Sequence, residues 1–159
     1  MQLISKDFNF NGKLALMVDK LQQSGLFEYL WQIFVTAPLV GFIYKRKGEP
    51  DTGEKKTIFL GQLTPRYDII HFIYKTILLA DNINEESPKA RIDKAFKNIN
   101  TEAAATDEHL FLLYLLGGIE VLYEKLIDKS TDITNNLNGF LDEIQIPDNS
   151  VVNEMGIDL

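Results

Sequence analysis

Residues 106–128 read TDEHLFLLYLLGGIEVLYEKLID, an apolar run followed by a glycine pair and an amphipathic continuation. Thr106 is a residue type that caps helix N-termini, and acidic side chains such as Asp107 and Glu108 are favourable at the positive end of a helix. The apolar run falls well short of the ~20 residues that a membrane-spanning helix needs. The stretch therefore predicts a central helix that other helices pack against, beginning at Thr106 or slightly earlier, at Thr101.

The glycine pair, Gly117 and Gly118, lies in the interior of this predicted helix. Each glycine costs on the order of 1 kcal/mol relative to alanine at such a position. A closely crossing helix would compensate for this cost, and so would a break that lets the helix restart at Ile119. We expect a close-packing point here, made either within the chain or at an interface with a partner.

Five further segments show apolar residues at three- and four-residue spacing between residue types that start or stop helices. These segments are 13–24, 27–37, 64–81, 88–99 and 132–146. Pro38 implies a kink or an end near Ala37, and Gly41 indicates a boundary. The helix over 64–81 is expected to bury one stripe of five side chains. They are Ile69, Ile70, Ile73, Ile77 and Leu78.

Two short β-prone runs, 42–44 and 57–60, flank a turn-rich loop and suggest a small two-stranded β-ribbon around residues 42–60. Residues 1–11 alternate weakly and suggest an arm. The sequence thus predicts a mostly α fold: a single helical domain of about six helices over residues 1–147, with a flexible C-terminal tail over 148–159.

Composition narrows the class of protein. The chain has 159 residues, a net charge of −7 and no cysteine, which excludes disulfides, thiolate metal sites and cysteine nucleophiles. No secretory signal or membrane span is evident. We expect a cytoplasmic protein without a membrane contact.

Basic residues gather in one part of this acidic chain, where aromatic residues interleave with them. This combination is typical of ribbons that bind nucleic acid by phosphate contact and base stacking. The residues concerned are Lys45, Arg46, Lys47, Lys55, Lys56 and Arg66. Acidic neighbours reduce the local field, and lysines also protect exposed strand edges, so an ordinary charged loop is the competing interpretation.

The sequence offers no complete catalytic or metal-binding motif. Asp51 and Glu54 match fragments of a metal-dependent nuclease pattern, but their spacing places both in one turn; a metal site would require a further carboxylate to converge on them. His71 and His109 lack any ligand spacing, and Glu120 with Glu124 is interpreted as a solvated helix face. We therefore expect no catalytic residue, no metal and no cofactor.

Two segments resemble a family of small proteins encoded beside bacterial DNA phosphorothioation (Dnd) systems. The resemblance covers about residues 26–126. It is carried by Gly41-Phe42 and by Tyr114, Gly117, Gly118, Ile119, Glu120, Val121 and Leu122. The chain departs from the family pattern at Pro38 and at Leu115-Leu116. The resemblance implies an accessory role in DNA modification or phage defence, with no catalytic site to transfer.

These observations lead to three functional hypotheses. The first is a non-enzymatic accessory protein that binds a protein partner or forms a homo-oligomer. The second is a nucleic-acid-binding module that uses the basic residues of 45–66. The third is an unrecognised metal-dependent enzyme.

Overall fold

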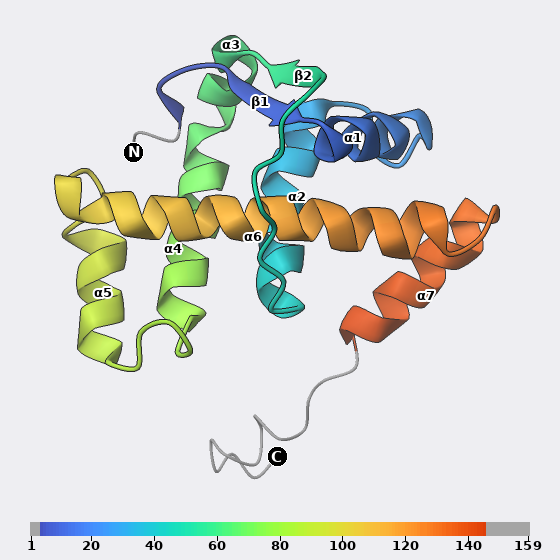
Figure 1. Ribbon diagram of the computed structural model, residues 1–159. Helices are drawn as coiled ribbons and strands as arrows, with labels where there is room; N and C mark the ends of the chain where they lie inside the picture. The colour runs from blue at the N-terminus through green and yellow to red at the C-terminus, as the bar shows by residue number, and fades with distance from the viewer. Residues whose placement is uncertain (1–3, 146–159) are drawn as a thin grey trace, which may run out of the picture.

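The computed structural model describes residues 4–145 and shows a mostly helical fold (Figure 1). The predicted fold class is confirmed: six helices are longer than one turn, and two strands form a small antiparallel sheet. In chain order the elements are β1 (Phe8–Asn11), α1 (Lys13–Gln23), α2 (Leu30–Ile43), β2 (Lys55–Ile58), α3 (Leu60–Leu63), η2 (Thr64–Arg66), α4 (Tyr67–Ala80), α5 (Pro88–Phe96), η3 (Glu102–Ala104), α6 (Ala105–Tyr123), η4 (Glu124–Asp128) and α7 (Ile133–Gln145). The tail predicted over 148–159 lies outside the described residues.

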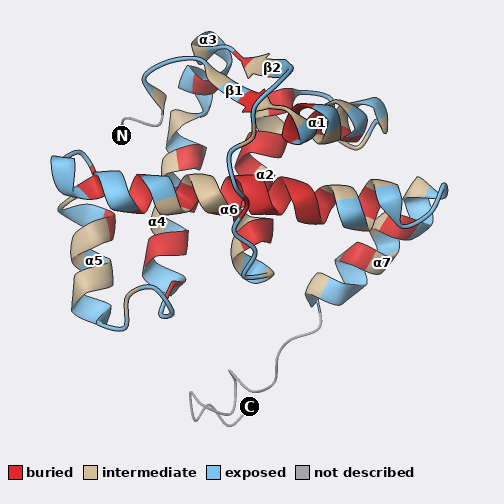
Figure 2. Ribbon diagram, viewed as in Figure 1, coloured by how far each residue is buried: buried red, intermediate tan, exposed pale blue. Residues whose placement is uncertain are grey.

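Helix α6 is the centre of the fold, as the sequence predicted. It extends across the whole molecule in Figure 1, and its middle is buried on nearly every side (Figure 2). Leu115 and Ile119 are fully enclosed, and even Glu120 is buried. Helices α1, α2 and α4 all pack against it. No helix within residues 4–145 has the length and apolar content required to cross a membrane.

Helix α2 crosses α6 at the glycine pair, with backbone against backbone. A Cβ atom built on Gly118 would lie 2.5 Å from the carbonyl carbon of Ala37 and 2.9 Å from the backbone nitrogen of Gly41. A Cβ on Gly41 would likewise lie 2.9 Å from the carbonyl carbon of Tyr114. These distances are shorter than side chains tolerate, so only glycine permits this approach. The close packing is made within the chain.

The segment 44–54, which we call the strap, crosses α6 on its way from the end of α2 to the sheet (Figure 1). The backbone N–H of Gly48 donates to the carbonyl of Leu113 at 2.8 Å, and a Cβ on Gly117 would lie 2.8 Å from the Gly48 nitrogen. Asp51 Oδ2 then accepts from the backbone N–H of Lys13 at 2.9 Å, at the start of α1. The two glycines of α6 thus serve two neighbours: Gly118 faces α2 and Gly117 faces the strap.

The two strands are not the pair that the sequence suggested. β2 does fall within the predicted ribbon, but it pairs with β1, so that Phe8 is opposite Ile58 and Asn11 is opposite Lys55. The predicted arm therefore supplies a strand, because its alternation buries Phe10. Residues 42–44 form no strand, since α2 continues to Ile43 and Tyr44 caps its end.

Helix α2 also passes Pro38, where an end near Ala37 was one of the two predicted outcomes. The helix continues to Ile43, with Pro38 and Gly41 both buried. A proline inside a helix costs about 3 kcal/mol. Packing of α2 on α6 outweighs this local cost, as tertiary contacts commonly override propensity.

Other helix ends follow the predicted signals closely. Ser87 caps α5 by accepting from the N–H of Ala90 at 3.3 Å, and Asp132 caps α7 by accepting from Asn135 at 3.0 Å. The helix predicted from Thr64 is instead divided: Thr64–Arg66 form the short 3₁₀ turn η2, and α4 begins at Tyr67.

Candidate functional site

The predicted basic residues do not form one surface. Lys45, Arg46 and Lys47 follow α2 on one side of α6, whereas Lys55 and Lys56 belong to β2 on the other side (Figure 1). The strap runs between the two groups. A continuous basic ribbon over 45–66 is therefore absent from the described fold.

Most of these cations are also engaged within the chain. Arg46 pairs with Glu120 at 3.4 Å and with Glu124 at 2.8 Å, and Lys56 pairs with Asp19 at 2.7 Å. These contacts reduce the positive charge available for phosphate groups.

The remaining members are dispersed. Lys47 donates to Asn84 at 2.8 Å, and the guanidinium of Arg66 lies 4.4 Å from the centre of the Trp31 ring. Lys45 and Lys55 are exposed.

Glu120 corrects the interpretation of a solvated face. Its side chain is only 12% exposed and pairs with Lys13 at 2.8 Å as well as with Arg46. The sequence missed this because the cations come from distant segments, α1 and the strap. Glu120 holds both of them against α6, while Glu124 remains exposed.

The acidic residues of the loop form no metal site. Both oxygens of Asp51 accept backbone N–H groups, from Lys13 and from Thr52 at 2.8 Å, and these bonds lower the pKa of Asp51. Within residues 4–145 no three histidine or carboxylate side chains are grouped as a metal site requires. Asp51 instead caps α1 and anchors the strap.

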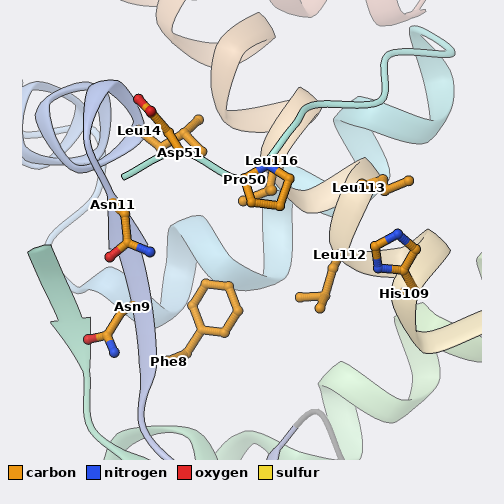
Figure 3. A pocket seen from close by; sticks show the side chains of 10 residues that line it. All are labelled: Phe8, Asn9, Asn11, Leu14, Pro50, Asp51, His109, Leu112, Leu113 and Leu116. Atoms are coloured by element: carbon orange, nitrogen blue, oxygen red, sulfur yellow. The ribbon is translucent and has the colours of Figure 1, made fainter. Parts of the chain in front are cut away.

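One cavity of about 170 Å³ lies between β1, the strap and α6 (Figure 3). Its walls are mainly apolar, with Asn9, Asn11 and Asp51 as polar residues on one side and His109 on the other. The other histidine, His71, stacks on Tyr67, and burial lowers its pKa. Neither histidine has a carboxylate or nucleophile arranged for catalysis among the contacts of the described residues.

The most unusual surface is on α4, which is apolar on two faces. The inner face buries Ile70, Ile73, Tyr74, Ile77 and Leu78. The outer face presents Ile69, Phe72 and Leu79 to solvent, and Phe72 is 69% exposed. Ile69 therefore lies outside the buried stripe that the sequence predicted. Asp68, Lys75 and Thr76 lie on the same outer side, so polar side chains alternate there with the exposed apolar ones.

Helix α5 extends this apolar surface. The apolar residues Ile92, Ala95, Phe96 and Ile99 share one face of the surface helix that the sequence predicted. Only Ala95 and Ile99 are buried; Ile92 and Phe96 are exposed, Phe96 by 57%. The ammonium of Lys75 on α4 lies 5.1 Å from the centre of the Phe96 ring, which joins the two helices across their outer side.

We call this set of exposed side chains the α4–α5 surface. Its members are Ile69, Phe72, Leu79, Ile92 and Phe96. In Figure 2 the two helices lie side by side at one end of α6, away from α7. Soluble proteins rarely leave such apolar groups together in water without a binding role.

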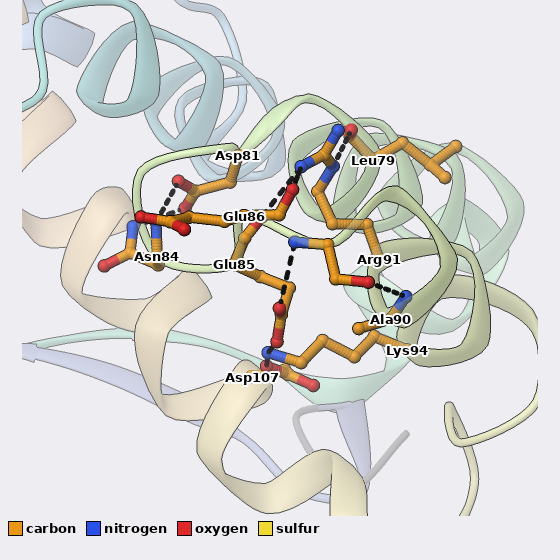
Figure 4. Close-up of polar contacts among 10 residues, drawn as sticks. Leu79, Asp81, Asn84, Glu85, Glu86, Ala90, Arg91, Lys94 and Asp107 are labelled. Atoms are coloured by element: carbon orange, nitrogen blue, oxygen red, sulfur yellow. Dashed lines mark hydrogen bonds and ion pairs between the residues drawn. The ribbon is translucent and has the colours of Figure 1, made fainter.

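Polar contacts hold α5 in position against the rest of the fold (Figure 4). Arg91 donates to three backbone carbonyls, those of Leu79 at 3.0 Å, Glu85 at 2.7 Å and Glu86 at 3.0 Å. Lys94 pairs with Glu85 at 3.4 Å and with the buried Asp107 at 3.2 Å. Burial lowers the pKa of Lys94, but these two carboxylates outweigh it and raise the pKa.

The loop between α4 and α5 is fixed from its other end by Asp81. This buried carboxylate accepts from the Asn84 amide at 2.6 Å and from the Tyr114 hydroxyl at 3.0 Å. Burial, followed by the nearby Asp81, raises the pKa of Tyr114 to about 12. Because polar groups position α5, its larger apolar side chains remain directed outward.

Comparison with protein-family models, with curated proteins and with solved structures finds no match to this chain. Its function must be inferred from the residues and their geometry.

Proposed function

We propose that this chain is a non-enzymatic accessory protein that binds another protein through the α4–α5 surface. The observation that supports this most is the second apolar face of α4, which continues onto α5. Burying a phenylalanine or isoleucine side chain contributes about 1.5–3 kcal/mol relative to leaving it in water. Five such side chains in one place offer a partner a substantial apolar contact.

The support for α5 gives the proposal a second basis. A helix that exposes its larger apolar residues gains little from the hydrophobic core, so Arg91 and Lys94 must hold it. Surfaces that are ordered before binding lose less entropy when a partner arrives. The polar contacts of Figure 4 therefore suit a preformed docking surface.

We also place this role in a bacterial DNA-modification or phage-defence complex, as the family resemblance implies. The residues that carry the resemblance, Gly41-Phe42 and 114–122, build the α2–α6 crossing. The resemblance thus lies in residues that build the core of the fold, whereas the proposed partner contact lies on the α4–α5 surface.

The experiment compares two glutamine variants in the native host. Phe72→Gln/Phe96→Gln removes the aromatic part of the surface with a residue that favours helix, and Leu16→Gln changes an apolar side chain of α1 that is 58% exposed. We expect the tagged wild-type chain and Leu16→Gln to elute in a complex, and the double variant to elute as the free chain. A free wild-type chain, or a complex that survives the double change, would contradict the proposal.

The nucleic-acid hypothesis remains a separate prediction. It requires a DNA affinity that falls steeply with salt and decreases in Lys55→Glu/Lys56→Glu. The internal pairing of Arg46 and Lys56 gives us no reason to prefer it. Absence of binding at low salt would end that hypothesis.

A further inference from the structure

The chemistry of the α4–α5 surface indicates what kind of segment it binds. This inference depends on the proposed function, because it concerns the same surface. Ile69 and Leu79 are ten residues apart on α4, a distance of about 15 Å along a helix. This length matches about three helical turns of a partner. Ile92 and Phe96, one turn apart on α5, lie along the same side.

The shape of the surface favours a helical partner. An amphipathic helix can lay its apolar face across the exposed apolar side chains of two adjacent helices. An extended segment would need a free strand edge for its backbone groups, and α4 and α5 offer none. The occupant is therefore a helix with apolar residues at three- and four-residue spacing.

The charged side chains of α4 and α5 indicate which charge the partner helix carries. From α4 to the end of α5, with the connecting loop included, four basic and five acidic residues give a net charge of −1, so this segment is nearly neutral in a chain that carries −7. Arg91 and Lys94 are turned to internal contacts, and Asp93 pairs with Lys97. Lys75 and Lys89 remain for a partner.

These two lysines lie at the apolar surface itself. Lys75 of α4 lies over the Phe96 ring. On α5, Lys89 precedes Ile92 by three residues, so Lys89 and Ile92 lie on the same side of that helix. Within residues 4–145 neither ammonium is placed in an ion pair. Two acidic residues of this segment are exposed: Asp68, one turn before Phe72, and Glu86, three residues before Lys89.

We propose that the α4–α5 surface binds an acidic amphipathic helix of another protein. Carboxylates flanking the apolar stripe of that helix pair with Lys75 and Lys89, while its apolar side chains contact Phe72 and Phe96. A second copy of this chain is a poorer occupant, because a two-fold contact through the same surface brings these lysines toward each other.

The test uses two synthetic helical peptides of about 18 residues, or five turns. Both carry leucines at helical spacing; one has glutamates and the other lysines at the flanking positions. We measure fluorescence anisotropy with the full chain. At low salt the acidic peptide should bind about tenfold more tightly than the basic one, and this preference should shrink as salt rises.

Two variants separate charge from apolar contact. Lys75→Glu/Lys89→Glu should reverse the preference between the peptides, while Phe72→Gln/Phe96→Gln should abolish binding of both. Circular dichroism checks that each variant keeps the helical content of the wild type. Lys20→Glu/Lys55→Glu, at exposed lysines of α1 and β2, changes the net charge by the same amount and should change neither affinity.

Other results would overturn the inference. Equal affinity for both peptides would contradict an acidic partner. If neither peptide binds, a helical partner is contradicted, even if the native complex still depends on Phe72 and Phe96. A dimer in sedimentation that the double glutamine variant dissociates would identify a second copy. Binding to anionic lipid vesicles that is lost in that variant would identify a membrane surface. If the native complex itself ignores the double variant, the proposed function fails instead.

Discussion

Replacing Gly118 by alanine tests the architecture most sharply, because local and tertiary effects have opposite signs. In a free helix, alanine is more favourable than glycine by about 0.8–1.0 kcal/mol. In this fold the added methyl group would lie 2.5 Å from the carbonyl carbon of Ala37, against ordinary contacts of 3.4–4 Å. The missing distance is at least about 0.9 Å, and the obstacle is backbone, which cannot rotate away as a side chain can.

Helices α2 and α6 must therefore separate over the best-packed part of the core. Overpacking of a core typically costs about 1–3 kcal/mol, and a rigid backbone contact belongs at the upper end. We expect Gly118→Ala to lower the free energy of unfolding by about 2 kcal/mol, which is the upper end of the packing cost less the gain in helix propensity. That is a large part of the 5–15 kcal/mol by which domains are usually stable.

Urea denaturation followed by circular dichroism measures this change. Gly139→Ala is the matched control, because Gly139 lies inside α7 and its Cβ would meet only the flexible end of Lys129, at 3.4 Å. The control should stabilise by a few tenths of a kcal/mol up to about 1 kcal/mol. If Gly118→Ala were neutral or stabilising like its control, the backbone crossing would be wrong.

Three further changes test the polar interior. In the same urea assay, Glu120→Gln should destabilise the fold by only about 0.5–1.5 kcal/mol, because its cationic partners are half exposed and screened by solvent. The exposed Glu124 is the control, and Glu124→Gln should change the stability by less than about 0.5 kcal/mol. Equal effects of the two changes would contradict the difference in burial. Tyr114→Phe should cost about 1–2 kcal/mol, because a buried carboxylate loses a donor, and a neutral result would contradict that contact. For His71, burial lowers the pKa below that of the unfolded chain, so the unfolded state binds a proton first and stability should fall as pH drops below about 6.5. His71→Gln should weaken this acid sensitivity in thermal melts between pH 8 and pH 5, with His109→Gln as the control; an unchanged pH profile would refute the assignment.

Sequence patterns predicted the elements whose signals are local. The cap at Asp132, the Ser87-Pro88 start of α5 and the central apolar helix all depend on neighbouring residues, and each is found. The glycine pair was also informative, because its local cost required a close neighbour. The structure identifies that neighbour as α2 on one side and the strap on the other.

Features that depend on distant residues could not be predicted. Continuation of α2 past Pro38 requires α6, and pairing of β2 with β1 requires the arm to fold back. Glu120 was misinterpreted because its cationic partners come from α1 and from the strap. A periodic pattern shows which positions are apolar, but the partner of each face is set by the fold.

The α4–α5 surface was missed for the same reason. The sequence grouped Ile69 with the buried stripe of α4, because apolar residues at helical spacing are expected to face the core. One signal was present: α4 carries apolar residues on two sides, too many for a single buried face. This excess is the basis of the docking surface that we propose.

Site-specific photo-crosslinking in the native host tests the central claim most directly. The photoreactive residue p-benzoylphenylalanine is placed at Phe72, at Phe96 or, as the control, at Leu16, all exposed to a similar extent. We predict that positions 72 and 96 crosslink to the same protein partner and that position 16 does not. Crosslinks of equal yield from all three positions, or from Leu16 alone, would contradict a docking surface on α4 and α5.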